Sequence, residues 1–236
     1  MNVVYICQCG LRTKIPKSLV VGMYNAVMSI QTPIPKEEID LAKQLKNIKV
    51  VFDVGARTDI DYLELWPNAE HHLFEPNPEF VKELEPKVKG KLNIYVNNFG
   101  LGNLEEERGY QDSRQSFVES ENLAPDSIFD RVLLIKTLDG YIQQHKIKQI
   151  DFLKIDTEGF DFKVLLGGEN SCKITRFIQY EHWDNKEEFH LLLEKDFDME
   201  YIGYRNVLCM NKELVPEGER QRLIKYIRDN KLGELV

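Results

Sequence analysis

Residues 49–76 restrict the fold of this chain more than any other part of the sequence. They contain two short apolar runs, Lys49–Val54 and His71–Phe74, separated by about one helix length. Two buried runs at this spacing are typical of a strand–helix–strand unit, in which both strands are parallel and covered by helices. The first run contains Asp53 close to its end, and the second is followed at once by Glu75. The segment therefore predicts one half of an α/β sheet with acids at its edge.

The same alternation continues towards the C-terminus. The expected strands are Lys49–Val54, His71–Phe74, Leu92–Val96, Val132–Lys136, Ile150–Ile155, Arg176–Tyr180, Met199–Tyr204 and Val207–Asn211. The expected helices between and after them are 59–66, 78–88, 137–145, 158–166, 185–194 and 218–230. This pattern predicts an α/β fold with a doubly wound, Rossmann-like sheet of about seven mostly parallel strands. The closing hairpin adds an antiparallel strand at or near one edge.

Two segments interrupt this rhythm. Residues 1–47 predict two helices, one capped by Ser18 and one opened by Pro35, so we expect a helical lead-in packed on the core. Such a lead-in is also compatible with a piece of a larger, multi-enzyme chain. We place the main domain at residues 48–236. Residues 102–130 are polar and predict an inserted loop that is longer than a usual connection.

Charge and cysteine content exclude several functions. The formal net charge of −8 argues against a nucleic-acid partner, because binding a phosphate backbone requires a dense basic face. The four cysteines, at positions 7, 9, 172 and 209, do not have zinc-site spacing. No secretory leader is visible, and the most apolar window, residues 19–30, is too short to span a membrane. We therefore expect a cytoplasmic protein without a membrane span.

Polar residues stand at the ends of five expected strands. Single acids at such positions often only cap helices, but five together favour a ligand site. In an open α/β sheet the ligand lies beyond the carboxyl ends of the strands. The residues at these five ends are Asp53 with Gly55, Glu75, Asn98, Asp156 with Glu158, and Glu181 with His182.

The turn after the first strand indicates the kind of cofactor. A dinucleotide loop would contain several glycines, but Gly55 stands alone and Asp59 would repel phosphate at the helix start. Glu75 is placed to bind ribose hydroxyls. A cationic cofactor without phosphate, S-adenosylmethionine, suits this acidic turn better than a nicotinamide dinucleotide.

Four motifs carry a resemblance to a known family. They are Val51-Phe-Asp-Val-Gly-Ala, Leu73-Phe-Glu-Pro-Asn-Pro, Lys136-Thr-Leu-Asp-Gly-Tyr and Ile150-Asp-Phe-Leu-Lys-Ile-Asp-Thr-Glu-Gly-Phe-Asp. Over residues 49–183 the chain resembles the FkbM family of S-adenosylmethionine-dependent methyltransferases. The resemblance implies a class I methyltransferase fold and O-methylation of sugars or natural-product hydroxyls. The sequence departs from the family at Asp59, where a glycine is usual.

The resemblance and the strand ends together predict the site residues. The segment Ser113–Ser116 resembles the family's loop over the site. The predicted cofactor-binding residues are Asp53, Gly55, Arg57, Glu75, Asn98, Ser116 and Asp156. We expect Lys154, inside an apolar strand, to pair with one of the strand-end acids. Trp183, Tyr180 and Phe160 are either an aromatic wall for a sugar or part of the core.

A sugar hydroxyl is a poor nucleophile, so a positioned base would assist methyl transfer. The predicted catalytic residues are Asp156, Glu181 and His182, and Glu158 is a further candidate base. The alternative is a divalent metal, Mg²⁺ or Ca²⁺, held by Asp156 and Glu181, which would lower the pKa of the hydroxyl.

The leading hypothesis is an O-methyltransferase that acts on a sugar hydroxyl of a glycan, for example a deoxyhexose. One alternative is a methyltransferase for a small natural-product hydroxyl. Another is a non-catalytic module that binds the cofactor, which the residue Asp59 motivates. A nucleotide-dependent oxidoreductase is disfavoured by the lone Gly55.

Overall fold

The structure is a computed structural model. It describes residues 2–6, 12–16, 35–112, 116–117, 130–182, 186–203 and 205–234. The chain divides into two compact units, Met1–Pro33 and Ile34–Val236. In the smaller unit, β1 (Asn2–Ile6) pairs in antiparallel fashion with β2 (Arg12–Pro16). We expected these two stretches to belong to a helical lead-in. Both contain several β-branched residues, which favour strands. The helix expected after Ser18 lies outside the described residues.

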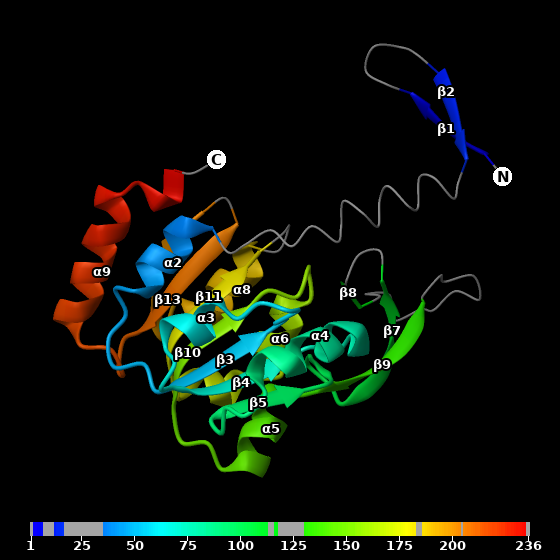
Figure 1. Cartoon of the computed structure of the whole chain (residues 1–236). Coiled ribbons are helices and arrows are strands. Elements are labelled where there is room, and N and C mark those ends of the chain that lie inside the picture. Colours follow the sequence, from blue (N-terminus) through cyan, green and yellow to red (C-terminus); the bar gives the residue numbers. More distant parts are fainter. Residues whose placement is uncertain are drawn as a thin grey trace. The chain divides into compact units, whose positions relative to one another are not determined.

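A seven-stranded sheet forms the centre of the larger unit (Figure 1). Its strands, in spatial order, are β12 (Phe197–Tyr201), β13 (Asn206–Asn211), β11 (Thr175–Glu181), β10 (Ile150–Ile155), β3 (Val50–Val54), β4 (Glu70–Phe74) and β5 (Ile94–Asn97). All neighbours are parallel except for β13, which runs antiparallel to both β11 and β12. The prediction of a mostly parallel, doubly wound sheet with an antiparallel strand near one edge is confirmed.

The strand order reverses between β3 and β10. From β3 the chain continues outward through β4 and β5, and it later returns to β10 and proceeds to β11 on the other side. The register pairs Asp53 of β3 with Lys154 of β10. Ligands in open α/β sheets bind at such a reversal, beyond the carboxyl ends of the strands. We therefore expect the ligand-binding site at this edge of the sheet.

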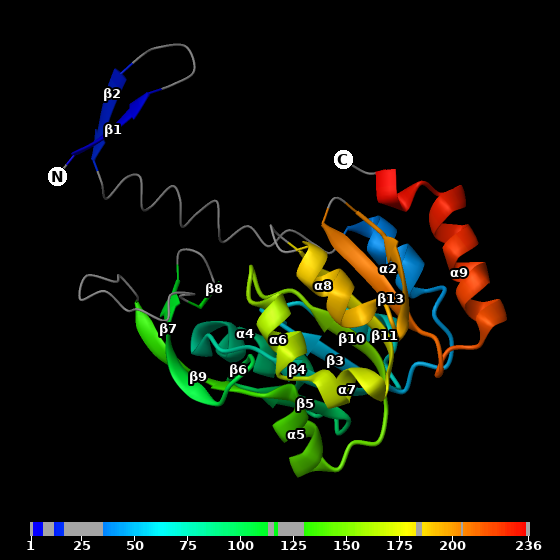
Figure 2. The same cartoon turned by 180° about the vertical axis from the view of Figure 1, so that it is seen from behind.

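Helices cover both faces of the sheet because successive side chains of a buried strand point to opposite faces. Leu153 packs with α5 (Leu138–His145) and α6 (Asp161–Leu166), whereas its neighbour Phe152 packs with α2 (Lys36–Ala42) and α9 (Glu217–Asp229). Figure 1 shows α3 (Asp61–Leu65) and α4 (Pro78–Val88) on the face nearer the viewer, and Figure 2 shows α6, α7 (Glu169–Lys173) and α8 (Lys186–Leu193) on the other face. The helices are α2 (Lys36–Ala42), α3 (Asp61–Leu65), α4 (Pro78–Val88), α5 (Leu138–His145), α6 (Asp161–Leu166), α7 (Glu169–Lys173), α8 (Lys186–Leu193), α9 (Glu217–Asp229) and the 3₁₀ turn η1 (Leu232–Glu234).

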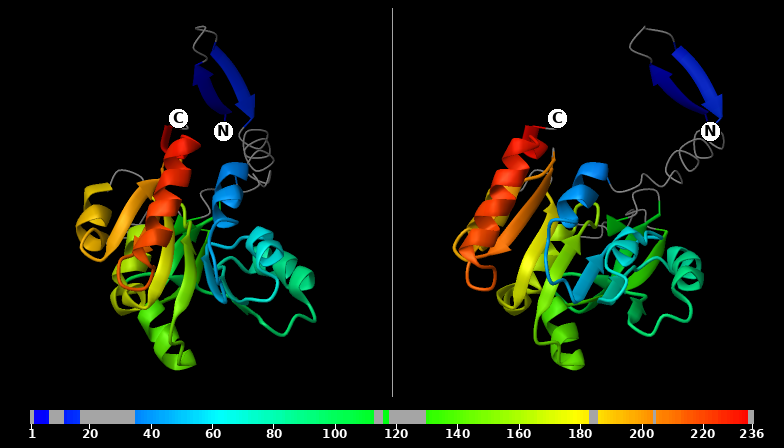
Figure 3. Two further views of the ribbon diagram at one scale, coloured as in Figure 1. Left: turned by 90° about the vertical axis from the view of Figure 1, so that its left-hand side faces the viewer. Right: turned by 60° about the vertical axis from the view of Figure 1, so that its left-hand side comes forward.

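The strands lie between these two helix layers (Figure 3). Helix α2 belongs to the larger unit, because Leu41, Ala42 and Leu45 are buried against the core. This unit therefore begins before residue 48, the boundary expected from the sequence. None of the helices in the described ranges has the length and apolar character needed to cross a bilayer.

The inserted segment forms structure of its own. Strands β6 (Gly100–Leu101), β9 (Arg131–Lys136), β7 (Glu106–Gln111) and β8 (Ser116–Phe117) make a second, four-stranded sheet in that order. The sequence predicted a loop over residues 102–130 and did not separate β9 from the main sheet. Strand β7 is polar and lacks an apolar run, whereas β9 has the apolar run that predicted a strand but is partly exposed, which is why the sequence did not assign it to a separate sheet.

Candidate active site

Gly55 joins three strand ends at the edge of the sheet. Its φ of +84° lies in the left-handed region, and a Cβ at this position would lie 1.9 Å from the carbonyl oxygen of Asp156. The N–H groups of Gly55 and Ala56 both donate to the carbonyl of Phe74, at 3.0 and 3.1 Å. Only glycine satisfies both the backbone angle and the close approach. The predicted turn thus brings the ends of β3, β4 and β10 into contact.

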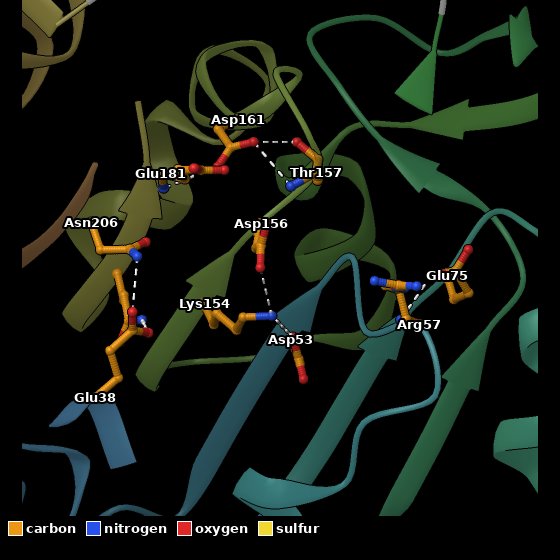
Figure 4. A network of polar contacts seen from close by, with 11 residues as sticks. Glu38, Asp53, Arg57, Glu75, Lys154, Asp156, Thr157, Asp161, Glu181 and Asn206 are labelled. Carbon is orange, nitrogen blue, oxygen red and sulfur yellow. Dashed lines mark hydrogen bonds and ion pairs between the residues drawn. The ribbon is translucent and has the colours of Figure 1, made fainter. Parts of the chain in front are cut away.

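A buried lysine connects two of the predicted acids (Figure 4). The Nζ of Lys154 lies 3.4 Å from Asp53 Oδ1 and 3.5 Å from Asp156 Oδ2. The side chains of Lys154 and Asp53 are 7% and 4% exposed, whereas that of Asp156 is 44% exposed. Burial alone would lower the pKa of Lys154, but Asp53 and Asp156 outweigh it and raise this pKa well above its usual range. The predicted pairing of Lys154 with a strand-end acid is confirmed.

Glu75 is held by the backbone at the end of β4. Its Oε2 accepts the N–H of Arg57 at 2.9 Å, and its Oε1 accepts the N–H of Asn77 at 2.7 Å. The residue is only 2% exposed, and this burial raises the pKa of Glu75 to about 7. A carboxylate has about four lone-pair positions, so two remain for hydroxyl donors.

The other predicted cofactor residues surround this turn. Arg57 has a φ of +47°, and its guanidinium lies over the ring of Phe80. Asn98 donates its amide to the carbonyls of Glu75 and Pro76, both at 3.0 Å. Asn98 therefore supports the strand end that carries Glu75.

Ser116 belongs to β8 of the second sheet. Its hydroxyl is buried and lies 3.5 Å from the carbonyl oxygen of Thr157, in the loop after β10. The rest of the segment Ser113–Ser116, which resembles the family's loop over the site, lies outside the described residues. The second sheet therefore contacts the same loop that carries Asp156.

Asp161 organises the other half of the site. Its carboxylate accepts the N–H and the hydroxyl of Thr157 as well as the N–H of Glu181 at 3.1 Å (Figure 4). Burial and the charges of Asp156 and Asp161 raise the pKa of Glu181 to about 7. Burial also raises the pKa of Asp161 itself, to about 6. No sequence signal marks Asp161, because an acid in the first turn of a helix is common.

His182 and Glu181 follow one another at the end of β11. The N–H of His182 donates to the carbonyl of Arg205 at 3.1 Å, and a guanidinium nitrogen of Arg205 lies 3.8 Å from Glu181 Oε1. His182 is 9% exposed, and its ring meets the ring of Tyr201 edge-on. Among Asp156, Glu181 and His182, Asp156 is thus the most open and His182 the most enclosed.

Neither Phe160 nor Tyr180 forms a wall at this edge. Phe160 and Tyr180 are fully buried core residues, and Tyr180 stacks on Phe189. Trp183 lies outside the described residues. Glu158 has a positive φ of 56° and lies in the loop after β10, where burial raises its pKa.

The alternative metal site needs a third ligand besides Asp156 and Glu181. Across the ranges that the structure describes, no three histidine, cysteine or acidic side chains gather closely enough to hold a metal ion. The described residues therefore offer a network of charged hydrogen bonds at this edge and not a ligand cage.

A third part of the network was not expected from the sequence. Glu38 of α2 accepts the amide of Gln179 at 2.6 Å and the amide of Asn206 at 2.8 Å (Figure 4). Glu38 is 6% exposed, and burial raises its pKa to about 7. Acids in the first turn of a helix are ordinary, so no sequence signal marks Glu38.

Comparison with known proteins identifies the family. The profile of the methyltransferase FkbM domain matches residues 53–205, which include the turn at Gly55, Glu75, Lys154 and Asp156. The chain belongs to the FkbM methyltransferase family. The resemblance seen in the motifs is confirmed. A search of curated proteins found no match.

Solved structures were compared with this chain. A putative caffeoyl-CoA O-methyltransferase from Staphylococcus aureus aligns with a TM-score of 0.50 and 8% identity, over 84% of this chain and 93% of that one. An FkbM methyltransferase from Methylobacillus flagellatus aligns with a TM-score of 0.49 and 13% identity, over 69% of this chain. The alignment spans only 43% of the Methylobacillus chain. The sheet order and the alignment with the Staphylococcus aureus structure show the Rossmann-like fold of class I methyltransferases in this FkbM family member.

Membership in this family implies S-adenosylmethionine as the methyl donor. The residues present fit that cofactor. Glu75 retains lone pairs for ribose hydroxyls, the backbone turn at Gly55 has no side chain in the way, and Asp156 is open at the adjacent strand end. When bound, the cofactor supplies an electrophilic methyl group on a sulfonium, and the surrounding carboxylates suit its positive charge.

Proposed function

We propose that this protein is an S-adenosylmethionine-dependent O-methyltransferase that acts on a hydroxyl group, most simply a sugar hydroxyl of a glycan. The observation that carries the proposal is the position of Asp156. Its carboxylate is 44% exposed at the reversal of strand order, between the Gly55 and Glu75 side and the Glu181 side. An open carboxylate between a cofactor half and a second polar half suits an acceptor base.

Methyl transfer is an in-line displacement, so the protein contributes mainly alignment and removal of the hydroxyl proton. Lys154 forms an ion pair with the Asp156 side chain, and the backbone N–H of Asp156 donates to the carbonyl of Val54 at 2.9 Å. The carboxylate is thereby fixed beside the turn that would bind the cofactor. We infer that Asp156 receives the proton of the acceptor hydroxyl.

Glu181 is the second candidate base. Its pKa of about 7 matches proton transfer near neutral pH, and it is held at the neighbouring strand end by Asp161. His182 is more enclosed than either acid, so we assign it to the wall of the site. We propose the cytoplasm as the compartment, since Cys172 and Cys209 are free thiols.

We expect Glu75→Ala to weaken S-adenosylmethionine binding by about 10- to 100-fold. The substitution removes a hydrogen bond between a charged acceptor and the ribose, which contributes about 1.5–3 kcal/mol. Titration calorimetry measures the effect, and thermal unfolding checks that the turn survives the loss of the two backbone contacts. As a matched control, Glu79→Ala changes an exposed acid on α4 and should leave the affinity unchanged. Equal affinity of wild type and Glu75→Ala would place the ribose elsewhere.

Cofactor affinity should also depend on pH. The pKa of Glu75 is about 7, so the ionised form that accepts hydroxyl donors is lost as the pH falls below that value. If only the ionised form binds, affinity falls about tenfold for each pH unit below 7 and is level above it. Glu75→Gln should remove this dependence. A wild-type affinity that is constant from about pH 5.5 to 8 would contradict the assignment.

A further inference from the structure

Glu38 of helix α2 places a carboxylate at the edge of the sheet, although the packing of α2 does not require a charged residue there. Leu41 and Ala42 of α2, together with Leu45 just after the helix, already pack against the core. Glu38 adds a nearly buried acid that accepts two side-chain amides. Burying a carboxylate costs more than burying an apolar residue of similar size. We therefore infer that the carboxylate of Glu38 has a role besides anchoring α2.

The residues that Glu38 holds lie beside the candidate active site. Asn206 begins β13 and pairs in register with Glu181 of β11, and it directly follows Arg205, the partner of Glu181. Both Asn206 and Glu181 are partly exposed. Residues 38 and 206 lie outside the segment that matches the family profile, residues 53–205. This corner is thus built in part by sequence that the family profile does not include.

A buried hydroxyl without a partner lies under the same network. Tyr62 is 2% exposed, and its hydroxyl has no hydrogen-bond partner among the residues that the structure describes. The charges that act most on this hydroxyl belong to Lys154 and Glu38. An unpaired buried hydroxyl is costly, so this corner contains a polar group that the described residues leave unsatisfied.

We propose that Asn206 and Glu181 bind neighbouring hydroxyls of an uncharged sugar acceptor, and that Glu38 is the positioning residue that orients Asn206. Carboxylates and carboxamides together offer the acceptors and donors that a polyol requires. An anionic group is disfavoured at this end, because the acids Glu38, Asp156 and Glu181 outnumber the nearby cations Lys154 and Arg205. This inference rests on the proposed function and adds the acceptor subsite to it.

The test measures ligand binding to the full chain saturated with S-adenosylhomocysteine. The probes are methyl glycosides of common neutral hexoses and deoxyhexoses, together with a methyl glucuronide and glucose 6-phosphate as anionic counterparts. Ligand-observed NMR gives the affinities. We expect at least one neutral glycoside to bind at least tenfold more tightly than either anionic probe. Glu38→Ala and Asn206→Ala should each weaken that glycoside at least tenfold and leave S-adenosylhomocysteine affinity unchanged.

Two variants distinguish positioning from loss of folding. Glu38→Gln keeps one carbonyl acceptor for Asn206 and should restore part of the glycoside affinity. Glu37→Gln alters the exposed neighbour on the same helix and should change nothing. The proposal is overturned if no neutral glycoside binds, if the anionic probes bind equally well, or if both alanine variants keep glycoside affinity. Failure of the wild type to bind S-adenosylhomocysteine would instead refute the proposed function.

Discussion

Asp156→Asn should lower the rate of methyl transfer at least 100-fold while S-adenosylmethionine affinity stays within about threefold of wild type. The amide keeps the size and position of the carboxylate but cannot receive the proton of the acceptor hydroxyl. Asp156 is the open member of the Lys154 pair, so its charge is available to a substrate. The measurement is the rate of label transfer from S-adenosylmethionine to the best acceptor of the neutral glycoside panel.

The matched control for this prediction is Asp196→Asn. Asp196 is exposed, and it lies on the turn before β12, at the opposite end of the strands from Asp156. It should leave both the rate and the affinity unchanged. If Asp156→Asn transfers methyl groups at the wild-type rate, Asp156 is a structural partner of Lys154, and Glu181 becomes the base to examine.

Lys154→Met should lower the free energy of unfolding by about 3–5 kcal/mol at neutral pH. Methionine fills the space of the lysine stem but leaves Asp53 buried without its cation, which is the costly way to break a buried ion pair. Chemical denaturation at pH 7 measures the loss. The deficit should shrink at lower pH, because burial already raises the pKa of Asp53 and protonation removes the unpaired charge.

Two comparisons isolate the ion pair in this experiment. The double variant Asp53→Leu, Lys154→Met removes both charges and should regain most of the lost stability. Lys82→Met breaks an exposed pair with Glu79 and should cost less than about 1 kcal/mol. Equal small losses for Lys154→Met and Lys82→Met would mean that Asp53 does not depend on Lys154.

The main sheet was predictable because its central strands are buried on both faces. A largely apolar run such as Ile150–Ile155 has few other structural interpretations once helices flank it. The polar residues at the strand ends then followed from topology alone, since parallel strands end at one edge. The second sheet was not predictable, because β7 has the composition of a loop and nothing in the apolar run of β9 shows that it pairs with β7 outside the main sheet.

The cofactor side of the candidate site was predictable from the sequence, but the prediction missed residues on the side of Glu181. Gly55 and Glu75 stand at motif positions, although the reason for the glycine, the carbonyl of Asp156, comes only from packing. Glu38 and Asp161 gave no signal, because acids in the first turn of a helix are favoured by the helix dipole in any protein. Their contacts with Asn206 and Glu181 join segments that are far apart in the sequence.

The central claim is that this edge of the sheet binds S-adenosylmethionine through Gly55 and Glu75. The most direct measurement is a calorimetric titration of the full chain with S-adenosylmethionine and, separately, with NAD. We expect saturable binding of S-adenosylmethionine with a dissociation constant below about 1 mM, weaker binding in Glu75→Ala, and no binding of NAD. An absence of S-adenosylmethionine binding at millimolar concentration, or tighter binding of NAD, would contradict it.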